Sequence, residues 1–424
     1  MTEPAAGRAR SREAVEAVFR EERGRLLAAL VARFGDLDLA EEVTSEAVEA
    51  ALIHWPRDGV PAKPGAWLLT TARRKAVDRL RRDTTYAARL AILQAEADRH
   101  DPATEATTAG ELPDERLQLF FTCTHPALAE EDRVALTLRC LGGLTTPEVA
   151  RAFLVPTATM SQRIVRAKKK IRVSRIPFRV PDGAELPERL PGVLAAIYSI
   201  FTEGYVASAG DSLQRVDLCD EAIRLTRILS RLMPHEREVA GLLALMLLTH
   251  ARHATRVGIG GEVVLLADQD RTRWDRQMIA EGAELVVTSL TGGPPGPYGV
   301  QAAIAAVHDE ADDIESTDWA QIVGLYDVLE SLAPSPVVSV NRAVAVAMRD
   351  GADAGLDRLD QIADDPRLRS YAPFSAARGD LLLRAGRHTE AAEAFALALD
   401  LAGTQPERRL LAGRLAQAKA AGAG

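Results

Sequence analysis

The sequence predicts an all-α protein that contains more than one helical domain. Only 4% of its residues are aromatic, whereas Ala, Leu and Arg are abundant. Long stretches repeat their apolar residues with the 3.6-residue period of an amphipathic helix. A chain of 424 residues is long enough for two or more domains, each with its own core.

The charge differs between the two halves of the chain. Residues 1–189 contain 30 Lys and Arg against 28 Asp and Glu, and residues 190–424 contain 22 against 32. The first half, with its local basic clusters, is suited to a nucleic acid. The acidic second half would be repelled by DNA and is better suited to protein or small-molecule partners.

Cysteine usage and hydropathy predict a soluble, cytoplasmic protein. Cys123, Cys140 and Cys219 show no metal-finger spacing and no even disulfide framework, so reduced thiols are expected. Cys123 and His125 are too few ligands for a metal, and packing between helices is the preferred interpretation. The longest apolar run, residues 239–248, is too short to cross a bilayer, and no secretory signal is expected. We expect no metal, no cofactor and no membrane partner.

Helices are expected at residues 13–34 and 39–54, the second of them capped by Asp36 or Asp38. A turn-rich loop at residues 55–65 should end the second helix. The acidic outer face of the helix at residues 39–54 is expected to be either solvated or docked on a basic partner. The residues expected to face inward are Leu39, Val43, Ala47 and Leu52, and those expected mostly outward are Glu41, Glu42, Glu46 and Glu49.

A third helix, residues 64–82, combines an apolar face with a basic one. Pro64 suits its first turn. Trp67 lies among basic side chains, where it can stack on an unpaired base, although packing on a neighbouring helix is the alternative. The expected inward residues are Ala66, Leu69, Ala72, Ala76, Val77 and Leu80; the other side carries Trp67, Thr71, Arg74, Asp78 and Arg81, with Lys75, Arg79 and Arg82 beside it.

A helix-turn-helix is expected at residues 144–172, after a polar linker at 83–112 and two further helices. The first of these helices starts at Pro113 and buries Leu117, Phe120 and Phe121; the second, residues 130–141, ends at Gly142 and Gly143. Thr145 and Glu148 form a capping box for the first helix of the motif. Pro156 ends that helix, and Thr157 is the expected cap of the next.

The second helix of the motif has one apolar and one basic side. Met160, Ile164, Ala167 and Ile171 recur at helical spacing, and residues 163–175 include seven basic residues and no acidic one. In a helix-turn-helix this helix enters the major groove, where early residues read base edges and later basic residues hold phosphates. The alternative is a charged, solvated helix in an ordinary bundle.

The second half is expected to be a helical domain with tetratricopeptide-like repeats. One repeat is expected over residues 379–398, and a second one, centred on Gly351, fits only weakly. Such repeats form concave protein-binding surfaces. The residues with repeat spacing are Gly379, Leu382, Gly386, Ala391, Phe395 and Ala398. Helices are expected at residues 192–203, 215–232, 235–253, 274–290, 299–311, 317–332, 336–349, 353–363, 371–385, 388–401 and 405–420.

Two motifs in this half are interpreted as structural. ADQDRTRW, residues 267–274, lacks a nearby histidine or glycine-rich loop that would complete a catalytic site, so a buried charge network is expected. In STDW, residues 316–319, Ser316 or Thr317 should cap a helix and Trp319 should pack against it.

In combination these motifs resemble a group-four (extracytoplasmic-function) sigma factor of the sigma-70 family. AEEVTSEA at residues 40–47 is similar to the clamp-binding motif of region two, and residues 64–82 are similar to its promoter-melting helix. FTCTHPAL, IFTEGY, GPYGVQAAIAAVH and SPVVSVNRAVA look like the subgroup with a C-terminal tetratricopeptide-like extension. Glu42, Ser45 and Thr124 depart from the family pattern, which has aspartate, glutamine and cysteine there.

The resemblance implies a specificity subunit of RNA polymerase and not an enzyme. Its parts would be region two (1–83), a linker (84–112), region four (113–176), a second linker (177–191) and a tetratricopeptide-like regulatory domain (192–424). Region two would bind the polymerase clamp and melt the −10 element. Region four would read the −35 element near the polymerase flap, and a protein partner could bind the repeat domain. Family members bind promoters productively only with the core polymerase.

The resemblance also implies three groups of site residues. The core-polymerase group is Glu41, Glu42, Ser45 and Glu46. The −10 group is Lys63, Trp67, Thr71, Arg74, Lys75, Asp78, Arg81 and Arg82. The −35 group is Thr157, Thr159, Gln162, Arg163, Arg166, Lys169 and Lys170.

Two other functions stay open from the sequence. A polymerase-independent regulator would bind duplex DNA tightly by itself and would leave the helix of Trp67 without a role. In an interaction scaffold the repeats would dominate, and glutamate at Arg163 and Arg166 would change nothing.

Overall fold

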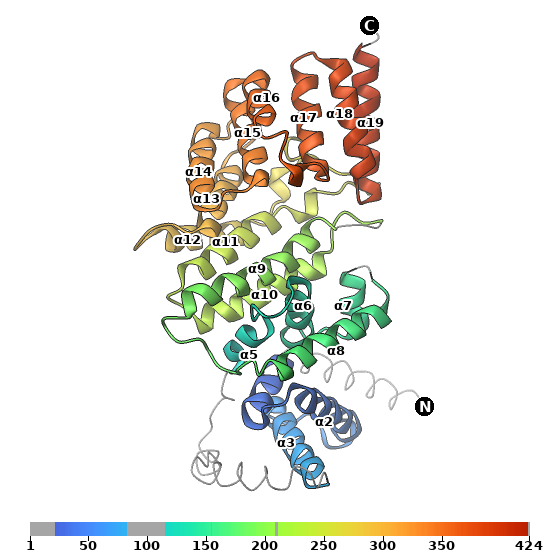
Figure 1. Cartoon of the computed structure of the whole chain (residues 1–424), viewed down its shortest axis with the longest axis vertical. Coiled ribbons are helices and arrows are strands. Elements are labelled where there is room, and N and C mark those ends of the chain that lie inside the picture. Colours follow the sequence, from blue (N-terminus) through green and yellow to red (C-terminus); the bar gives the residue numbers. More distant parts are fainter. Residues whose placement is uncertain (1–21, 83–114, 154, 208–210, 423–424) are drawn as a thin grey trace. The chain divides into compact units, whose positions relative to one another are not determined.

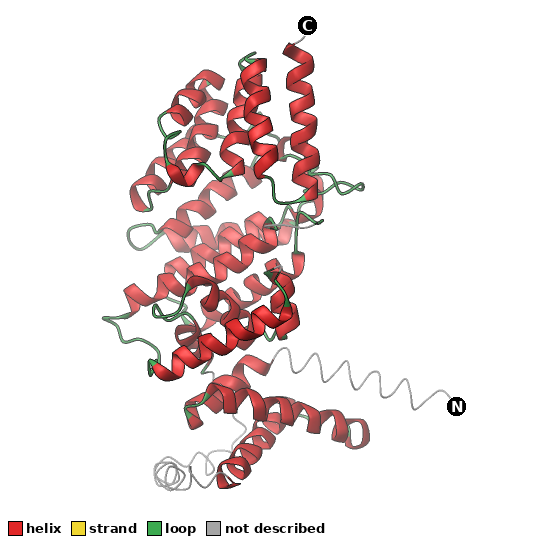
Figure 2. Cartoon of the chain, turned by 45° about the vertical axis from the view of Figure 1, so that its right-hand side comes forward, coloured by secondary structure: helices red, strands yellow, loops and turns green. Residues whose placement is uncertain are grey.

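A computed structural model describes residues 22–82, 115–153, 155–207 and 211–422 (Figure 1). These residues form helices and loops without a β-strand, and one isolated bridge joins Val257 to Val263 (Figure 2). The predicted all-α class is confirmed. The chain divides into two compact units, Met1–Ile197 and Tyr198–Gly424.

The first unit starts with a helix over residues 22–34, the described part of the predicted helix 13–34. Asp36 caps the next helix, α2 (Leu37–Asp58), and accepts hydrogen bonds from the backbone N–H groups of Asp38 and Leu39 at 2.8 and 3.0 Å. Of the two candidate caps, Asp36 is therefore the correct one.

The end and the buried face of α2 differ from the prediction. The helix continues through Pro56 to Asp58, because Trp55 is only 2% exposed and extends the apolar stripe by one turn. Leu52, predicted to face inward, is 40% exposed, and Leu39 is half-buried. The stripe that is buried consists of Leu37, Ala40, Val43, Thr44, Ala47, Ala51 and Trp55, together with Glu41.

α3 (Pro64–Arg82) has the predicted bounds and packs against α2. Four of its predicted inward residues are buried: Leu69, Ala72, Ala76 and Leu80. Leu68 is buried as well, whereas Ala66 and Val77 are half-buried, so the apolar face is turned slightly from the predicted one.

The remaining helices of this unit build the helix-turn-helix. They are α5 (Arg116–Cys123), α6 (Glu130–Leu136), the π-helical turn η2 (Thr137–Leu141), α7 (Thr146–Ala152) and α8 (Thr157–Val173). Phe120 and Phe121 are buried as predicted, and Leu117 is half-buried. Gly143 has a φ of 75°, which supplies the predicted left-handed turn after η2. The predicted linker 83–112 and the predicted helix start at Pro113 lie outside the described residues.

The helix α9 (Leu186–Tyr205) begins in the first unit and ends in the second. It starts six residues before the predicted position 192, since Pro187 is tolerated in a first turn, where a helix lacks N–H partners anyway. The other long helices are close to prediction: α10 (Val216–Leu232), α11 (Arg237–His250), α12 (Arg276–Leu290), α13 (Pro297–Glu310), α14 (Trp319–Leu332), α15 (Pro336–Asp350), α16 (Ala352–Asp360), α17 (Ala372–Arg384), α18 (His388–Leu401) and α19 (Gln405–Gly422).

The residues with repeat spacing form a helical hairpin. α17, α18 and α19 lie side by side (Figure 1). Gly379 of α17 faces Phe395 of α18 so closely that a Cβ at position 379 would lie 2.8 Å from the ring. Gly386 turns the chain between these helices with a φ of 73°. The weaker upstream match corresponds to the hairpin of α15 and α16, which turns at Gly351 with a φ of 101°.

The ADQDRTRW motif contains helix caps rather than the predicted buried charge network. Asp270 caps the short helix η5 (Arg271–Arg273), and Asp275 caps α12. The buried Arg271 donates to the main-chain oxygens of His308 and Ala311 at 2.6 and 2.7 Å. The predicted network within the motif was wrong because its carboxylates are exposed and one of them, Asp270, caps a helix. The buried Arg271 binds backbone oxygens and has acidic neighbours, among them Asp309, outside the motif.

The cap in STDW is also a different residue from the predicted ones. Asp318 accepts from the backbone N–H of Gln321 at 2.9 Å and caps α14, whereas Ser316 and Thr317 bind Asp313. Trp319 packs as predicted and donates its indole N–H to the oxygen of Ile314 at 3.1 Å. In the described part of the chain, no helix is both long and apolar enough to cross a membrane.

Candidate nucleic-acid and polymerase interfaces

The predicted capping box orients the first helix of the helix-turn-helix. The backbone N–H and the hydroxyl of Thr145 donate to the carboxylate of Glu148 at 2.7 and 2.8 Å. The backbone N–H of Glu148 lies 3.4 Å from the hydroxyl oxygen of Thr145. Two backbone donors at the start of α7 are thus satisfied by side chains.

The second helix, α8, presents a polar and basic surface. Its buried side consists of Met160, Ile164 and Ala167, while Ile171 is half-buried. Thr157 occupies the first helical position rather than the predicted cap, since Pro156 holds the cap position and no side chain caps this end. The exposed residues of the −35 group are Thr157, Thr159, Gln162, Arg166, Lys169 and Lys170.

Arg163 differs from the other residues of the −35 group. Its guanidinium forms an ion pair with Glu131 at 2.8 Å and lies 5.9 Å from the ring centre of Phe153. The side chain is half-buried and connects α8 to α6, which carries Glu131. Of the two arginines singled out by the sequence, Arg166 is the one that the structure leaves exposed.

In α3 the −10 group follows one side of the helix. Lys63, just before the helix, and Arg74, Asp78 and Arg81 are exposed. Thr71 and Lys75 are half-buried, and the side chain of Arg82 lies outside the described set. Trp67 is half-buried too, and its ring meets that of Trp55 edge-on with centres 5.6 Å apart. Packing on a neighbouring helix, one of the two interpretations of Trp67, is thus present.

Glu41 of the core-polymerase group lies in a buried cluster of opposite charges, not on the outer face as predicted. It is only 7% exposed and pairs with Arg23 at 3.0 Å, with Arg139 of η2 at 3.3 Å, and with Lys168 of α8. Lys168 also pairs with Asp38 at 3.1 Å. This cluster joins the start of α2 to the recognition helix.

The charges of the cluster shift each other's protonation. Burial alone would raise the pKa of Glu41, but Arg139, Lys168 and Arg23 outweigh it and hold that pKa below its usual value. Burial would lower the pKa of Lys168, yet the negative charge of Glu41 raises it overall. Both side chains are therefore charged at neutral pH.

The other three residues of the core-polymerase group remain at the surface. Glu42 and Ser45 are exposed, and Glu46 is half-buried. Glu46 pairs with Lys75 and Arg79 of α3 at 3.2 and 3.1 Å. Ion pairs in such positions are weak, about 0–1 kcal/mol each, so these carboxylates can exchange partners.

Arg23, Arg139 and Lys168 were not singled out by the sequence, although they organise this region. Lys168 is one of seven basic residues between 163 and 175, and nothing in its local pattern distinguishes it from Lys169 or Lys170. Its half-burial depends on a contact with a residue 127 positions away, which no local pattern encodes.

Cys123, Cys140 and Cys219 are buried free thiols. Within the described residues, no group of three or more His, Cys, Asp or Glu side chains could hold a metal ion.

A helix-turn-helix with a basic recognition helix, preceded by a helix pair with acidic and basic faces, is the arrangement of a DNA-binding protein. Residues 18–85 match sigma-70 region 2, and residues 121–171 match sigma-70 region 4. Residues 189–290 match a family of unknown function (DUF6596). The chain belongs to the sigma-70 family and carries a helical C-terminal extension.

A relative covers both units of the chain. An uncharacterized protein of Rhizobium meliloti (strain 1021) is 44% identical over 387 residues, which are 91% of each chain. No solved structure matches the chain. The sigma-70 regions imply RNA polymerase and promoter DNA as partners and support the role of an RNA polymerase sigma factor.

Proposed function

We propose that this chain is a promoter-specificity subunit of cytoplasmic RNA polymerase, without catalytic groups of its own, whose extension regulates it. The observation that carries this proposal is the exposed polar and basic side of α8. This helix lies in a sigma-70 region 4 that follows a sigma-70 region 2 in the same chain. As a member of the group-four type, the protein would recognise both promoter elements through two short helical regions.

Region four supplies the −35 contacts in this proposal. Thr159, Gln162 and Arg166 lie in the first half of α8, where a recognition helix meets base edges, and Lys169 and Lys170 hold phosphates. Thr157 adds a hydroxyl at the helix start. Arg163 acts mainly by positioning α8, because Glu131 engages its guanidinium.

Region two supplies the −10 contacts. The basic residues at and beside α3 hold the backbone of the opened strand, and the half-buried ring of Trp67, beside Trp55 and His54, supports a displaced base. Glu42, Ser45 and Glu46 bind the clamp of the core polymerase. Glu41 joins them only when α8 withdraws Lys168, so binding to the core opens the contact between α2 and α8.

Run-off transcription by the full chain with purified core polymerase tests this proposal. The template pool carries randomised −35 and −10 segments. We expect transcripts from the unchanged chain and at least a ten-fold loss with Arg166→Glu, because a reversed charge at a phosphate-lined groove removes contacts worth about 1–3 kcal/mol each.

The control for this experiment is Lys419→Glu, which makes the same charge reversal at an exposed site of α19. Full activity of the Arg166→Glu chain would refute the −35 assignment. Absence of transcripts from the unchanged chain would favour the polymerase-independent regulator.

The regulatory role of the extension has its own test. The full chain is compared with a shortened chain that ends at Arg179 in the same assay. More transcription from the shortened chain makes the extension an inhibitor, and transcription from the full chain alone makes it a required part. Equal transcription from both would contradict regulation by the extension.

A further inference from the structure

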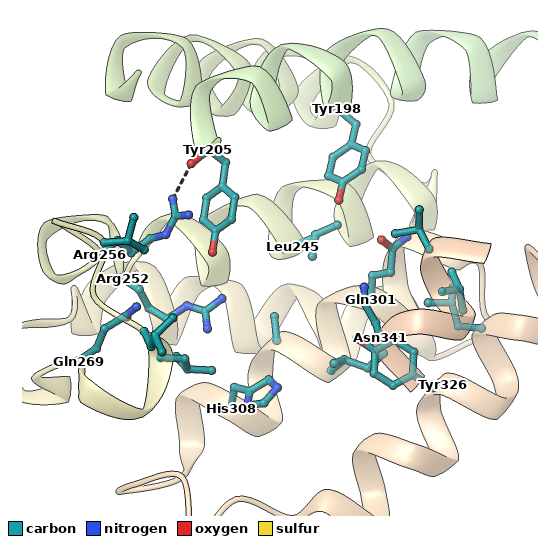
Figure 3. Close-up of a pocket in the computed structure, with 18 of the residues that line it drawn as sticks. Tyr198, Tyr205, Leu245, Arg252, Arg256, Gln269, Gln301, His308, Tyr326 and Asn341 are labelled. Atoms are coloured by element: carbon teal, nitrogen blue, oxygen red, sulfur yellow. Dashed lines mark hydrogen bonds between the residues drawn. The ribbon is translucent and has the colours of Figure 1, made fainter. Parts of the chain in front are cut away.

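The second unit contains a cavity of about 510 Å³, within the size range of small-molecule sites. It lies where the helices of the 189–290 segment meet the helices that follow them (Figure 3). Tyrosine rings and aliphatic side chains form much of its wall, and Gln269, Gln301 and Asn341 add amide groups. No aspartate or glutamate of the described residues lines it, although this unit belongs to the acidic half of the chain.

Two arginines contribute their guanidinium groups to this cavity. Arg252 and Arg256 are only 9% and 8% exposed. Arg256 donates to the main-chain oxygen of Tyr205 at 2.6 Å and lies over the Tyr205 ring at 3.4 Å. It forms no ion pair with a carboxylate of the described residues. A buried cation without a counter-charge is costly, and a bound anion would remove that cost.

The positive charge of Arg252 is only partly balanced by a neighbouring carboxylate. The Nε of Arg252 lies 3.8 Å from Asp309, too far for a hydrogen bond, and is a buried donor without a hydrogen-bond partner in the described structure. Burial raises the pKa of Asp309 to about 7, so the carboxyl group that faces Arg252 is only partly ionised at pH 7. The charges of the two lining arginines are therefore not fully balanced by neighbouring carboxylates.

The neutral groups of the wall can complete such a site. Nδ1 of His308 is buried and has no hydrogen-bond partner among the described residues. Burial, with Arg252 and Arg271 nearby, lowers the pKa of His308 to about 4, so its ring is neutral at pH 7 and can donate or accept. Burial also raises the pKa of Tyr326 to about 12, which keeps its hydroxyl protonated.

We propose that this cavity binds a small organic anion, a carboxylate or phosphate joined to an aromatic or aliphatic body. The guanidinium of Arg252 pairs with the anionic group, and Arg256 adds its charge from beside Tyr205. A guanidinium fork matches both oxyanions, and the tyrosine and aliphatic walls cover the apolar body. Because binding takes place on the chain alone, its failure and the failure of the transcription proposal are separate results.

Calorimetry with the full chain tests this site. The probes are benzoate, phenyl phosphate, inorganic phosphate and benzamide, the uncharged counterpart of benzoate. We expect one site for benzoate or phenyl phosphate, at least about ten-fold weaker binding of benzamide, and weaker binding of inorganic phosphate than of phenyl phosphate. A preference for benzoate identifies a carboxylate site, and a preference for phenyl phosphate identifies a phosphate site.

Three variants complete the test. Arg252→Gln should lose at least ten-fold in affinity for the preferred probe. Asn341→Asp changes an exposed lining residue without changing its size, so it folds and should weaken binding several-fold by repulsion. Arg227→Gln, whose arginine pairs with Glu281 away from the cavity, should bind as the unchanged chain does.

Three results would overturn the proposal. The first is no saturable binding of either organic anion at millimolar concentration, and the second is equal binding of benzoate and benzamide. The third is unchanged binding by Asn341→Asp, which decides the matter even if Arg252→Gln fails to fold.

Discussion

Glu41 is the residue on which three positive side chains from distant parts of the sequence converge. Arg23, Arg139 and Lys168 approach it from the first described helix, from η2 and from α8. Buried ions of this kind are destabilising unless every partner is present, because each has lost its hydration. The cluster therefore makes the position of the recognition helix depend on one carboxylate of α2.

Glu41→Gln tests this dependence, since it keeps the side-chain size and removes the charge. Loss of one partner of a buried ion pair costs roughly 3–5 kcal/mol. We expect the opening free energy of the α2 and α8 amides, measured by hydrogen exchange at pH 7, to fall accordingly. Glu42→Gln at an exposed position is the control and should change it by less than about 1 kcal/mol.

In acid, the Glu41→Gln chain and the unchanged chain should have the same opening free energy. The pKa of Glu41 is held below its usual value, so its contribution is present at neutral pH and disappears as the pH falls through that lowered pKa. Hydrogen exchange repeated at decreasing pH should show the difference between Glu41→Gln and the unchanged chain shrinking. A difference that stays constant in acid would contradict the charge-based account.

Because of Asp309, the stability of the second unit should depend on pH in the opposite direction. Burial raises its pKa from 3.8 to about 7, so the folded chain loses stability as the pH rises from about 4 to about 7, and the loss levels off above that range. Asp309→Asn cannot ionise. Between pH 5 and pH 8 we expect the unchanged chain to lose stability relative to this variant, as measured by urea unfolding. Asp357→Asn, at an exposed site, should follow the unchanged chain.

Among the elements, α11 and α13 show how small residues allow close packing. Gly241 of α11 faces the backbone of α13, and a Cβ there would lie 2.6 Å from the nitrogen of Gly299. The carboxylate of Glu238 accepts hydrogen bonds from the N–H groups of Tyr298 and Gly299 at 3.0 and 3.1 Å. α11 thus caps the start of α13 while touching its main chain, which explains the second glycine of GPYG, Gly299.

Gly241→Ala should therefore destabilise the second unit. The main chain of α13 cannot move as a flexible side chain does, and overpacking costs about 1–3 kcal/mol. Gly324→Ala is the matched control, because Gly324 is also helical and its Cβ would meet open space. It should be neutral or stabilising by up to about 1 kcal/mol. Equal urea midpoints for both variants would contradict the close contact.

At the scale of the whole molecule, the charge distribution predicts weak DNA binding by the chain alone. Its net charge is −8, and the basic surfaces of α3 and α8 are small parts of it that favour DNA. We expect anisotropy titrations with duplex promoter DNA to show weak binding without core polymerase, weakening further between about 50 and 200 mM salt as counterion release predicts. Tight, sequence-specific binding by the chain alone would instead support a polymerase-independent regulator.

The sequence by itself determined most helices and the surface of α8. The predicted helices at 215–232, 336–349 and 388–401 agree with α10, α15 and α18 to within a residue at each end. The capping box of Thr145 and Glu148 and the hairpin of Gly379 and Phe395 were also readable. The helix bounds and the capping box depend on neighbours within about one or two helical turns, and the hairpin follows from a repeat of small and large residues over a longer stretch. Both kinds of spacing can be read directly from the sequence.

The tertiary structure alone decided which of the similar charges are buried. It half-buries Lys168 and Arg163 in ion pairs but leaves their neighbours Lys169 and Arg166 exposed. It also buries Glu41 and brings Arg252 and Arg256 to a cavity that no carboxylate of the described residues lines. These outcomes depend on helices that meet after long stretches of intervening sequence. The free energy of a charge depends on its burial and its partners, and both are set only when those helices pack.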